Sequence, residues 1–162
     1  KVNGLAGGEV PKVDPATAKK TFAAVHEAIS AGLVRSCHDL SEGGLAVAAA
    51  EMAFAGGIGM RLDLGRVPND VSGGPDERNA AMLFSESNTR FLCEVSGVDE
   101  EAFCACFEKA GVPCAAIGRT QEDSELRIVG IPLQADNGRS APVVIAAGLA
   151  EVKAAWQSPL DW

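Results

Sequence analysis

The chain has 162 residues, of which 47% are hydrophobic, and a formal net charge of -8. That length suits one domain or two very small ones, and the acidic balance argues against broad electrostatic binding to nucleic acid or to anionic membranes. No apolar run approaches the roughly 20 residues of a membrane span, and nothing resembles a signal peptide. We therefore expect a cytoplasmic globular protein with no nucleic-acid partner and no membrane partner.

The five cysteines are an odd number, and their spacings match neither a zinc site nor a CxxC redox motif. This pattern is typical of reduced thiols that serve as small hydrophobic side chains in a cytosolic protein. None of them lies in the sequence context of a catalytic nucleophile. We therefore assign no catalytic cysteine.

The chain opens on a glycine-rich stretch that indicates a piece of a longer protein, with a linker at 1–13 and one domain at 14–162. Asp14 and Pro15 mark the start of a helix, because Asp is a good N-cap and Pro fits the first helical position. Gly32 ends this helix. Its apolar stripe is predicted at Ala18, Phe22, Val25 and Ile29.

The most informative stretch follows, His38-Asp39-Leu40-Ser41-Glu42-Gly43-Gly44-Leu45. A short strand at 33–37 is predicted before it, and a helix begins at Ser41 or Glu42 and ends at Gly56-Gly57. A carboxylate, a hydroxyl and two glycines thus meet at a helix N-terminus, whose free N–H groups favour anions. The stretch predicts a phosphate and metal site, with ordinary helix capping as the alternative.

The rest of the chain interleaves strands and helices. In order, we expect a strand at 58–64, a long connection at 65–79 with a short helix at 75–82, a polar cluster and a strand within 83–95, a helix at 99–111, strands at 112–117 and 126–129 joined by a hairpin turn at 121–125, an apolar segment at 142–145 and a helix at 149–156. This order lacks strict strand-helix alternation. It predicts an α/β (α+β) sandwich in which helices pack on a mixed β-sheet.

A second motif, Leu83-Phe84-Ser85-Glu86-Ser87-Asn88-Thr89-Arg90-Phe91, stands downstream of the first. Together the two motifs resemble the C-terminal domain of phosphoribosylformylglycinamidine synthase, a relative of aminoimidazole ribonucleotide synthetase. The segments Glu51–Gly57 and Ala155–Leu160 are similar to that family as well. The Ser-Glu-Gly-Gly version of the first motif resembles the second of two such domains in the family's synthetase chain.

The resemblance implies an ATP-dependent ligase of purine biosynthesis. The family converts formylglycinamide ribonucleotide and glutamine-derived ammonia to formylglycinamidine ribonucleotide, through an iminophosphate, with release of ADP and phosphate. The expected cofactors are Mg²⁺ and ATP or ADP. The expected partners are the remaining domains of the parent synthetase, a glutaminase subunit or domain, and a small ammonia-transfer subunit.

Carried over by motif, Asp39 matches the family's magnesium ligand, and Ser41 matches a serine that contacts nucleotide. Mg²⁺ prefers hard carboxylate oxygens and shares its shell with phosphate and water. The other nucleotide-binding candidates are Gly43, Gly44, Glu86 and Ser87. For the glycines a tight turn with helix packing is the alternative, and for Glu86 and Ser87 it is turn stabilisation.

We assign no catalytic residue and expect the domain alone to be inactive, because the resemblance places the ATP-binding and catalytic elements mostly on other domains. Two alternatives remain. The chain could be the corresponding domain of aminoimidazole ribonucleotide synthetase, selenophosphate synthetase or thiamin-monophosphate kinase. It could also be a non-catalytic scaffold domain with a structural nucleotide site.

Overall fold

The computed structural model describes residues 10–132 and 141–160, so most of the expected linker at 1–13 lies outside the described residues. Its helices are α1 (Pro15–Ser30), α2 (Gly44–Gly56), α3 (Pro75–Phe84), α4 (Glu100–Ala110) and α5 (Leu149–Gln157), with short 3-10 helices η1 (Leu64–Arg66) and η2 (Ser158–Leu160). Its strands are β1 (Val34–Asp39), β2 (Gly59–Asp63), β3 (Phe91–Val95), β4 (Gly118–Gln121), β5 (Glu125–Val129) and β6 (Val143–Gly148).

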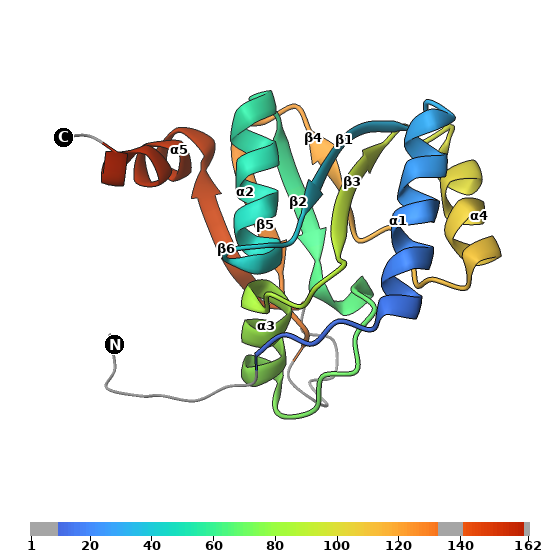
Figure 1. Cartoon of the computed structure of the whole chain (residues 1–162). Helices are drawn as coiled ribbons and strands as arrows, with labels where there is room; N and C mark the ends of the chain where they lie inside the picture. Colours follow the sequence, from blue (N-terminus) through green and yellow to red (C-terminus); the bar gives the residue numbers. More distant parts are fainter. Residues whose placement is uncertain (1–9, 133–140, 161–162) are drawn as a thin grey trace.

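The strands form two sheets rather than the one that the sequence predicted. β1 and β3 pair antiparallel, and the other four strands form a mixed sheet in the order β4-β2-β5-β6, with β2 and β5 parallel. In Figure 1, α1 and α4 lie side by side at one end of the molecule and α5 lies at the other. The predicted class, mixed α/β with helices packed on a mixed sheet, is confirmed.

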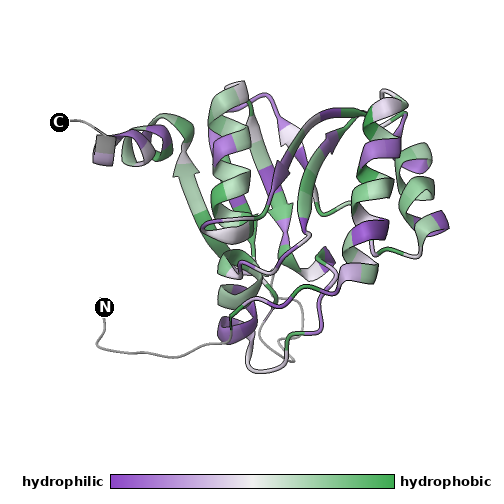
Figure 2. Cartoon of the chain, viewed as in Figure 1, coloured by the Kyte–Doolittle hydropathy of each residue, from purple (hydrophilic) through white to green (hydrophobic). Residues whose placement is uncertain are grey.

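The larger core surrounds α2, which is apolar along nearly all of its length (Figure 2). A helix that is hydrophobic all round must be covered on several sides. Here Met60, Leu62, Leu126 and Ile128 from one face of the mixed sheet belong to the same core cluster as the α2 side chains. α3 and α5 also contribute buried residues to it. The helix α2 is therefore covered on several sides.

The smaller core lies between α1, α4 and the two-stranded sheet. Ala24, Val25 and Ala28 of α1 are buried together with Phe103 and Phe107 of α4. The predicted stripe on α1 is half wrong: Phe22 and Ile29 are 53% and 50% exposed, because the face toward α4 is lined by small side chains. The predicted N-terminus is confirmed, since the Asp14 carboxylate accepts bonds from the first turn.

The predicted hairpin at 121–125 is wrong. β4 and β5 do not pair, because β2 lies between them in the sheet. The short link from β4 to β5 passes the beginning of β2, where the Gly59 N–H donates to the Asp123 carbonyl oxygen at 2.8 Å. A Cβ on Gly59 would collide with Asp123, so glycine permits this crossing.

The strand predicted at 112–117 is also wrong, because that segment is irregular and the strand starts at Gly118. Pairing with β2 decides where β4 begins, and such a partner is invisible in the local sequence. The segment predicted at 142–145 only as apolar belongs to strand β6, which pairs with β5. The other predicted elements are confirmed with shifts at their ends, including the short helix after Pro75 and the last helix from Leu149. Across residues 10–132 and 141–160, none of the helices is long and apolar enough to cross a bilayer.

Candidate functional site

Asp39 is the last residue of β1, which runs two residues past the strand predicted at 33–37, and β1 delivers it to the entrance of α2 as expected. Its side chain is 63% exposed. Ser41 follows in the short link and is exposed as well. A carboxylate and a hydroxyl therefore stand in solvent beside a helix N-terminus.

The start of α2 differs from the prediction. The helix begins at Gly44, its N-cap is Gly43, and no side chain caps it, so neither Ser41 nor Glu42 has the expected capping role. Gly43 and Gly44 have positive φ values of 75° and 60°, which glycine adopts without strain. The chain enters this helix through two left-handed residues rather than through a polar cap.

Gly44 also marks a close approach between the two motifs. A Cβ there would lie 2.7 Å from the Ser85 carbonyl oxygen and 2.9 Å from the Leu83 carbonyl oxygen. The Gly43 N–H in turn donates to Glu86 Oε1 at 3.0 Å. Two motifs that are 43 residues apart therefore meet at one helix N-terminus.

The second motif is an ordered polar turn between α3 and β3. The Ser85 and Ser87 hydroxyl oxygens are 2.7 Å apart. Arg90 is half-buried and donates to the Ser85 carbonyl oxygen at 3.3 Å. Thr89 adopts a φ of +61°, an uncommon value for a residue other than glycine. Such strain in a polar turn is typical of functional segments.

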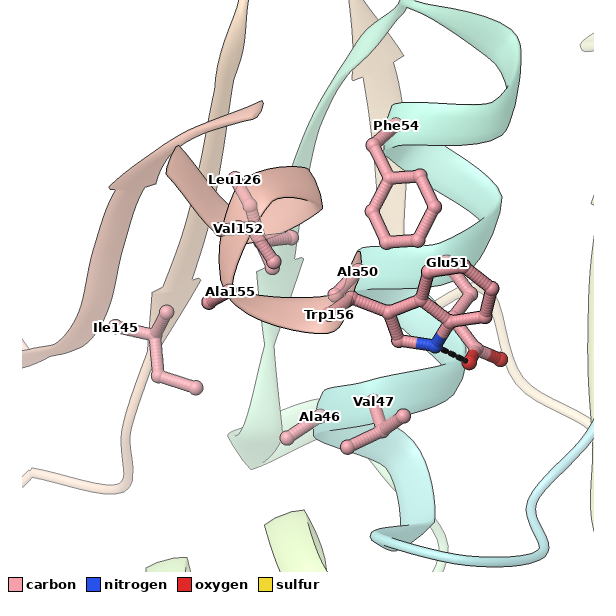
Figure 3. Close-up of a pocket in the computed structure, with 10 residues that line it drawn as sticks. All are labelled: Ala46, Val47, Ala50, Glu51, Phe54, Leu126, Ile145, Val152, Ala155 and Trp156. Atoms are coloured by element: carbon pink, nitrogen blue, oxygen red, sulfur yellow. Dashed lines mark hydrogen bonds between the residues drawn. The ribbon is translucent and has the colours of Figure 1, made fainter. Parts of the chain in front are cut away.

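Glu51 was missed by sequence reasoning, and it links the site to α5. Its Oε2 lies 2.7 Å from His38 Nε2, and its Oε1 accepts a bond of 2.6 Å from Trp156 Nε1 (Figure 3). Glu51 is the one charged residue of α2. That isolated charge in an apolar helix was the signal that could have revealed it.

His38 is held at both ring nitrogens. Its Nδ1 lies 2.6 Å from the Asp39 carbonyl oxygen while Nε2 faces Glu51. Both partners are acceptors, so the geometry favours the doubly protonated imidazolium. Partial burial by itself lowers the pKa of His38, but the hydrogen bonds to the Asp39 backbone and to Glu51 outweigh it and raise the pKa above 6.5.

Two hollows flank this region. One, of about 510 Å³, is lined by Val10, Pro11, Lys12, Phe84, Ser85, Glu86 and Ser87. It therefore brings the predicted residues Glu86 and Ser87 together with a lysine. The other, of about 300 Å³, is lined by residues of α2, β5, β6 and α5, and among the described residues that line it Glu51 is the charged one (Figure 3).

The residues present fit a shared metal site better than a complete one. No group of three or more His, Cys, Asp or Glu side chains that could hold a metal ion occurs in the described part of the chain. Mg²⁺ is nevertheless often bound through one or two carboxylates, with phosphate and water completing the shell. An exposed Asp39 beside a helix N-terminus fits such a role.

A mixed four-stranded sheet, a helix entered through two glycines and two polar motifs that meet at its N-terminus define a mixed α/β domain. The model of the family described as AIR synthase related protein, C-terminal domain, matches residues 1–131. The chain therefore belongs to this family. The match spans both motifs and ends just after β5.

Two kinds of relative extend this finding. The phosphoribosylformylglycinamidine synthase subunit PurL of Deinococcus radiodurans is 38% identical over 98% of this chain, which spans 19% of that protein. Thermotoga maritima PurL, solved in complex with ADP, has a TM-score of 0.73 at 23% identity and covers 87% of this chain, with 22% of its own length matched. The structure of T. maritima PurLQS gives a TM-score of 0.70, also at 23% identity, over 87% of this chain and 22% of that one. The chain thus spans about a fifth of the length of these relatives.

Proposed function

We propose that this chain is the C-terminal domain of a phosphoribosylformylglycinamidine synthase subunit and supplies magnesium and nucleotide contacts to it. In that role the whole enzyme converts formylglycinamide ribonucleotide, ATP and ammonia to formylglycinamidine ribonucleotide. The observation that supports this most directly is the contact between the two motifs at the α2 N-terminus, through the Gly43 N–H and the Glu86 carboxylate. Membership of the family supports it independently.

The chemical contribution of the domain is charge neutralisation and positioning. Phosphoryl transfer depends mainly on both, and Mg²⁺ supplies much of the neutralisation when it is bound. Asp39 offers one hard oxygen ligand at the end of β1. Ser41 offers a hydroxyl beside the α2 N-terminus, where phosphate oxygens are favoured.

Glu86 has a more specific part in this proposal. Its carboxylate already accepts a helix N-terminal N–H, so a phosphate bound at that N–H would have to displace it. We therefore assign Glu86 to holding the two motifs in register and Ser87 to the hollow beside Lys12. Gly43 and Gly44 serve the close backbone approach that this arrangement needs.

The cofactors and partners follow from the same proposal. T. maritima PurL is described with bound ADP and as part of PurLQS. We propose Mg²⁺ with ATP or ADP as the ligands of this chain, and the other synthetase domains, a glutaminase and a small ammonia-transfer subunit as its partners in the cytoplasm. The isolated chain is proposed to be inactive, because it supplies half of a site.

The test uses the complete synthetase polypeptide that carries this domain. Isothermal titration with Mg·ADP compares Asp39→Ala with Asp70→Ala, an exposed acid in the loop after η1 that has no part in the site. Weaker Mg·ADP binding in Asp39→Ala alone supports the proposal. Equal Mg·ADP binding by the wild type and both variants would refute the assignment of Asp39 as a metal ligand.

Turnover separates a catalytic contribution from a scaffold with a structural nucleotide. Asp39→Ala and Ser41→Ala lower turnover sharply at an unchanged melting temperature if the site serves the reaction. A lower melting temperature at nearly normal turnover favours the scaffold.

A further inference from the structure

Cys37 and Cys93 face each other across the two-stranded sheet. They are paired in the register of β1 and β3, and their sulfur atoms are 3.5 Å apart. Both thiols are free, Cys37 is exposed, and Cys93 is partly exposed. A small reagent can therefore reach a pair of thiols that are already in contact.

The hydrogen bonds between β1 and β3 show whether Cys37 and Cys93 form a hydrogen-bonded or a non-hydrogen-bonded pair. The Leu40 N–H donates to the Arg90 carbonyl oxygen at 2.9 Å, so these two residues occupy a hydrogen-bonded position at the end of the ladder. Hydrogen-bonded and non-hydrogen-bonded pairs alternate in an antiparallel sheet. Counting back three positions places Cys37 and Cys93 in a non-hydrogen-bonded pair, in which Cα atoms are about 4.5 Å apart.

That spacing is within the range that a disulfide can bridge, roughly 4.4–6.8 Å between Cα atoms. Paired residues also project their side chains to the same face of a sheet. Formation of the disulfide therefore needs only a movement of the two sulfur atoms toward each other, and neither strand has to shift. The backbone has arranged the dithiol in advance.

We propose that Cys37 and Cys93 form a dithiol modification site that reacts with low-molecular-weight disulfides to give a reversible cross-strand disulfide. The Cys37 thiolate attacks the small disulfide, whose S–S bond breaks and releases one thiolate. Cys93 loses its proton to solvent and attacks the Cys37 sulfur, releasing the second thiolate. Two protein thiols are oxidised and one small disulfide is reduced to two thiols.

The bond would tie β3 to the strand that ends at Asp39, two residues after Cys37. The inference does not depend on the proposed function, because it rests on sheet register and thiol contact alone. A second sulfur contact, between Cys104 and Cys114 at 3.9 Å, provides an internal comparison. Cys106 provides a control, since its thiol lies against the Ala102 carbonyl oxygen of its own helix.

The experiment incubates the folded 162-residue chain with oxidised glutathione, blocks the remaining thiols by alkylation, and measures masses without reductant. Digestion with trypsin and a glutamate-specific protease separates Cys93 from Cys104, because Glu94, Glu100 and Glu101 lie between them. The expected product is a peptide pair linked through Cys37 and Cys93, with two hydrogen atoms lost. Dithiothreitol restores the starting mass.

Variants test the order of attack. Cys93→Ser retains a glutathione adduct on Cys37, because no second thiol remains to release it. Cys37→Ser forms no link to Cys93, whereas Cys106→Ser behaves as the wild type. Glutathione adducts without an internal link in the wild type, or a link confined to Cys104 and Cys114, would overturn the proposal.

Discussion

Replacing Glu51 by Gln tests how the candidate site is joined to the C-terminal helix. Each carboxylate oxygen of Glu51 accepts one bond, Oε2 from His38 and Oε1 from Trp156. Glutamine has one acceptor oxygen, and its NH₂ group would face a second donor. While His38 carries protons on both ring nitrogens, the substitution therefore sets two donors against each other and breaks one of the two bonds.

The expected cost follows from the kind of bond that is lost. Hydrogen bonds to charged groups contribute about 1.5–3 kcal/mol to the free energy of unfolding. The His38 and Glu51 side chains are 29% and 25% exposed, so solvent reduces the cost toward the lower value. A loss of about 1.5 kcal/mol lowers the melting temperature of a domain of this size by about 3–6 °C.

A double-mutant cycle with Trp156→Phe isolates the contact, because phenylalanine keeps an aromatic ring against Phe54 but removes the indole donor. Once that donor is gone, Glu51→Gln retains an acceptor for His38 and costs less. Circular dichroism melts of the four proteins should give a coupling of about 1 kcal/mol. Additive single-variant effects, or a Glu51→Gln melt identical to that of the wild type, would refute the bridging role.

The bridge also predicts a pH dependence. The pKa of His38 is raised in the folded chain, so its contribution to stability is complete below the ordinary value of 6.5. It is lost as the pH rises through the higher pKa of the folded state. The difference in melting temperature between the wild type and Glu51→Gln should therefore narrow at alkaline pH. A difference that widens there would contradict this prediction.

Three further substitutions probe separate features. Gly44→Ala should lower the free energy of unfolding by about 2–4 kcal/mol in urea melts, since its φ is +60° and a Cβ would meet two backbone carbonyl oxygens; wild-type stability would contradict the close approach. Arg61 is paired with Arg119 on one neighbouring strand and with Arg127 on the other, so like charges lie side by side. Arg61→Thr should therefore raise the free energy of unfolding by several tenths of a kcal/mol. If charge repulsion is the cause, this gain becomes smaller at high salt. A hydroxyl and two backbone N–H groups hold the pKa of Asp14 below 3.8, so its capping stability is lost as the pH falls through the lowered pKa. Asp14→Ala should accordingly lower the melting temperature at neutral pH but not in strong acid, and equal loss at both would be inconsistent with capping by the carboxylate.

Local signals were enough for most of the helices. Asp14 and Pro15 marked the start of α1, and the glycine pair at 56–57 marked the end of α2, because caps act within one turn of the chain. Strand pairing was less accessible. β4 begins at Gly118 because it pairs with β2 from there on, and the sequence around residue 118 contains no signal for that partner.

In the candidate site, too, local sequence named the residues but did not predict how they come together. The sequence motifs named Asp39, Ser41 and Glu86 and predicted that they serve one function. The structure places no side-chain cap at Ser41 or Glu42 and instead brings Glu86 to the Gly43 N–H, just before the first turn of α2. A helix N-terminus needs acceptors for its free N–H groups, and a distant carboxylate can supply one as well as a neighbouring side chain.

By itself, the sequence determined the family, the mixed α/β class and most of the helix boundaries, because motifs, periodicity and caps are properties of short segments. Only the tertiary structure decided the strand order, the meeting of the two motifs, and the link from His38 through Glu51 to Trp156. Glu51 and Trp156 are 105 residues apart. Contacts over such separations depend on packing of the whole chain, which no local pattern encodes.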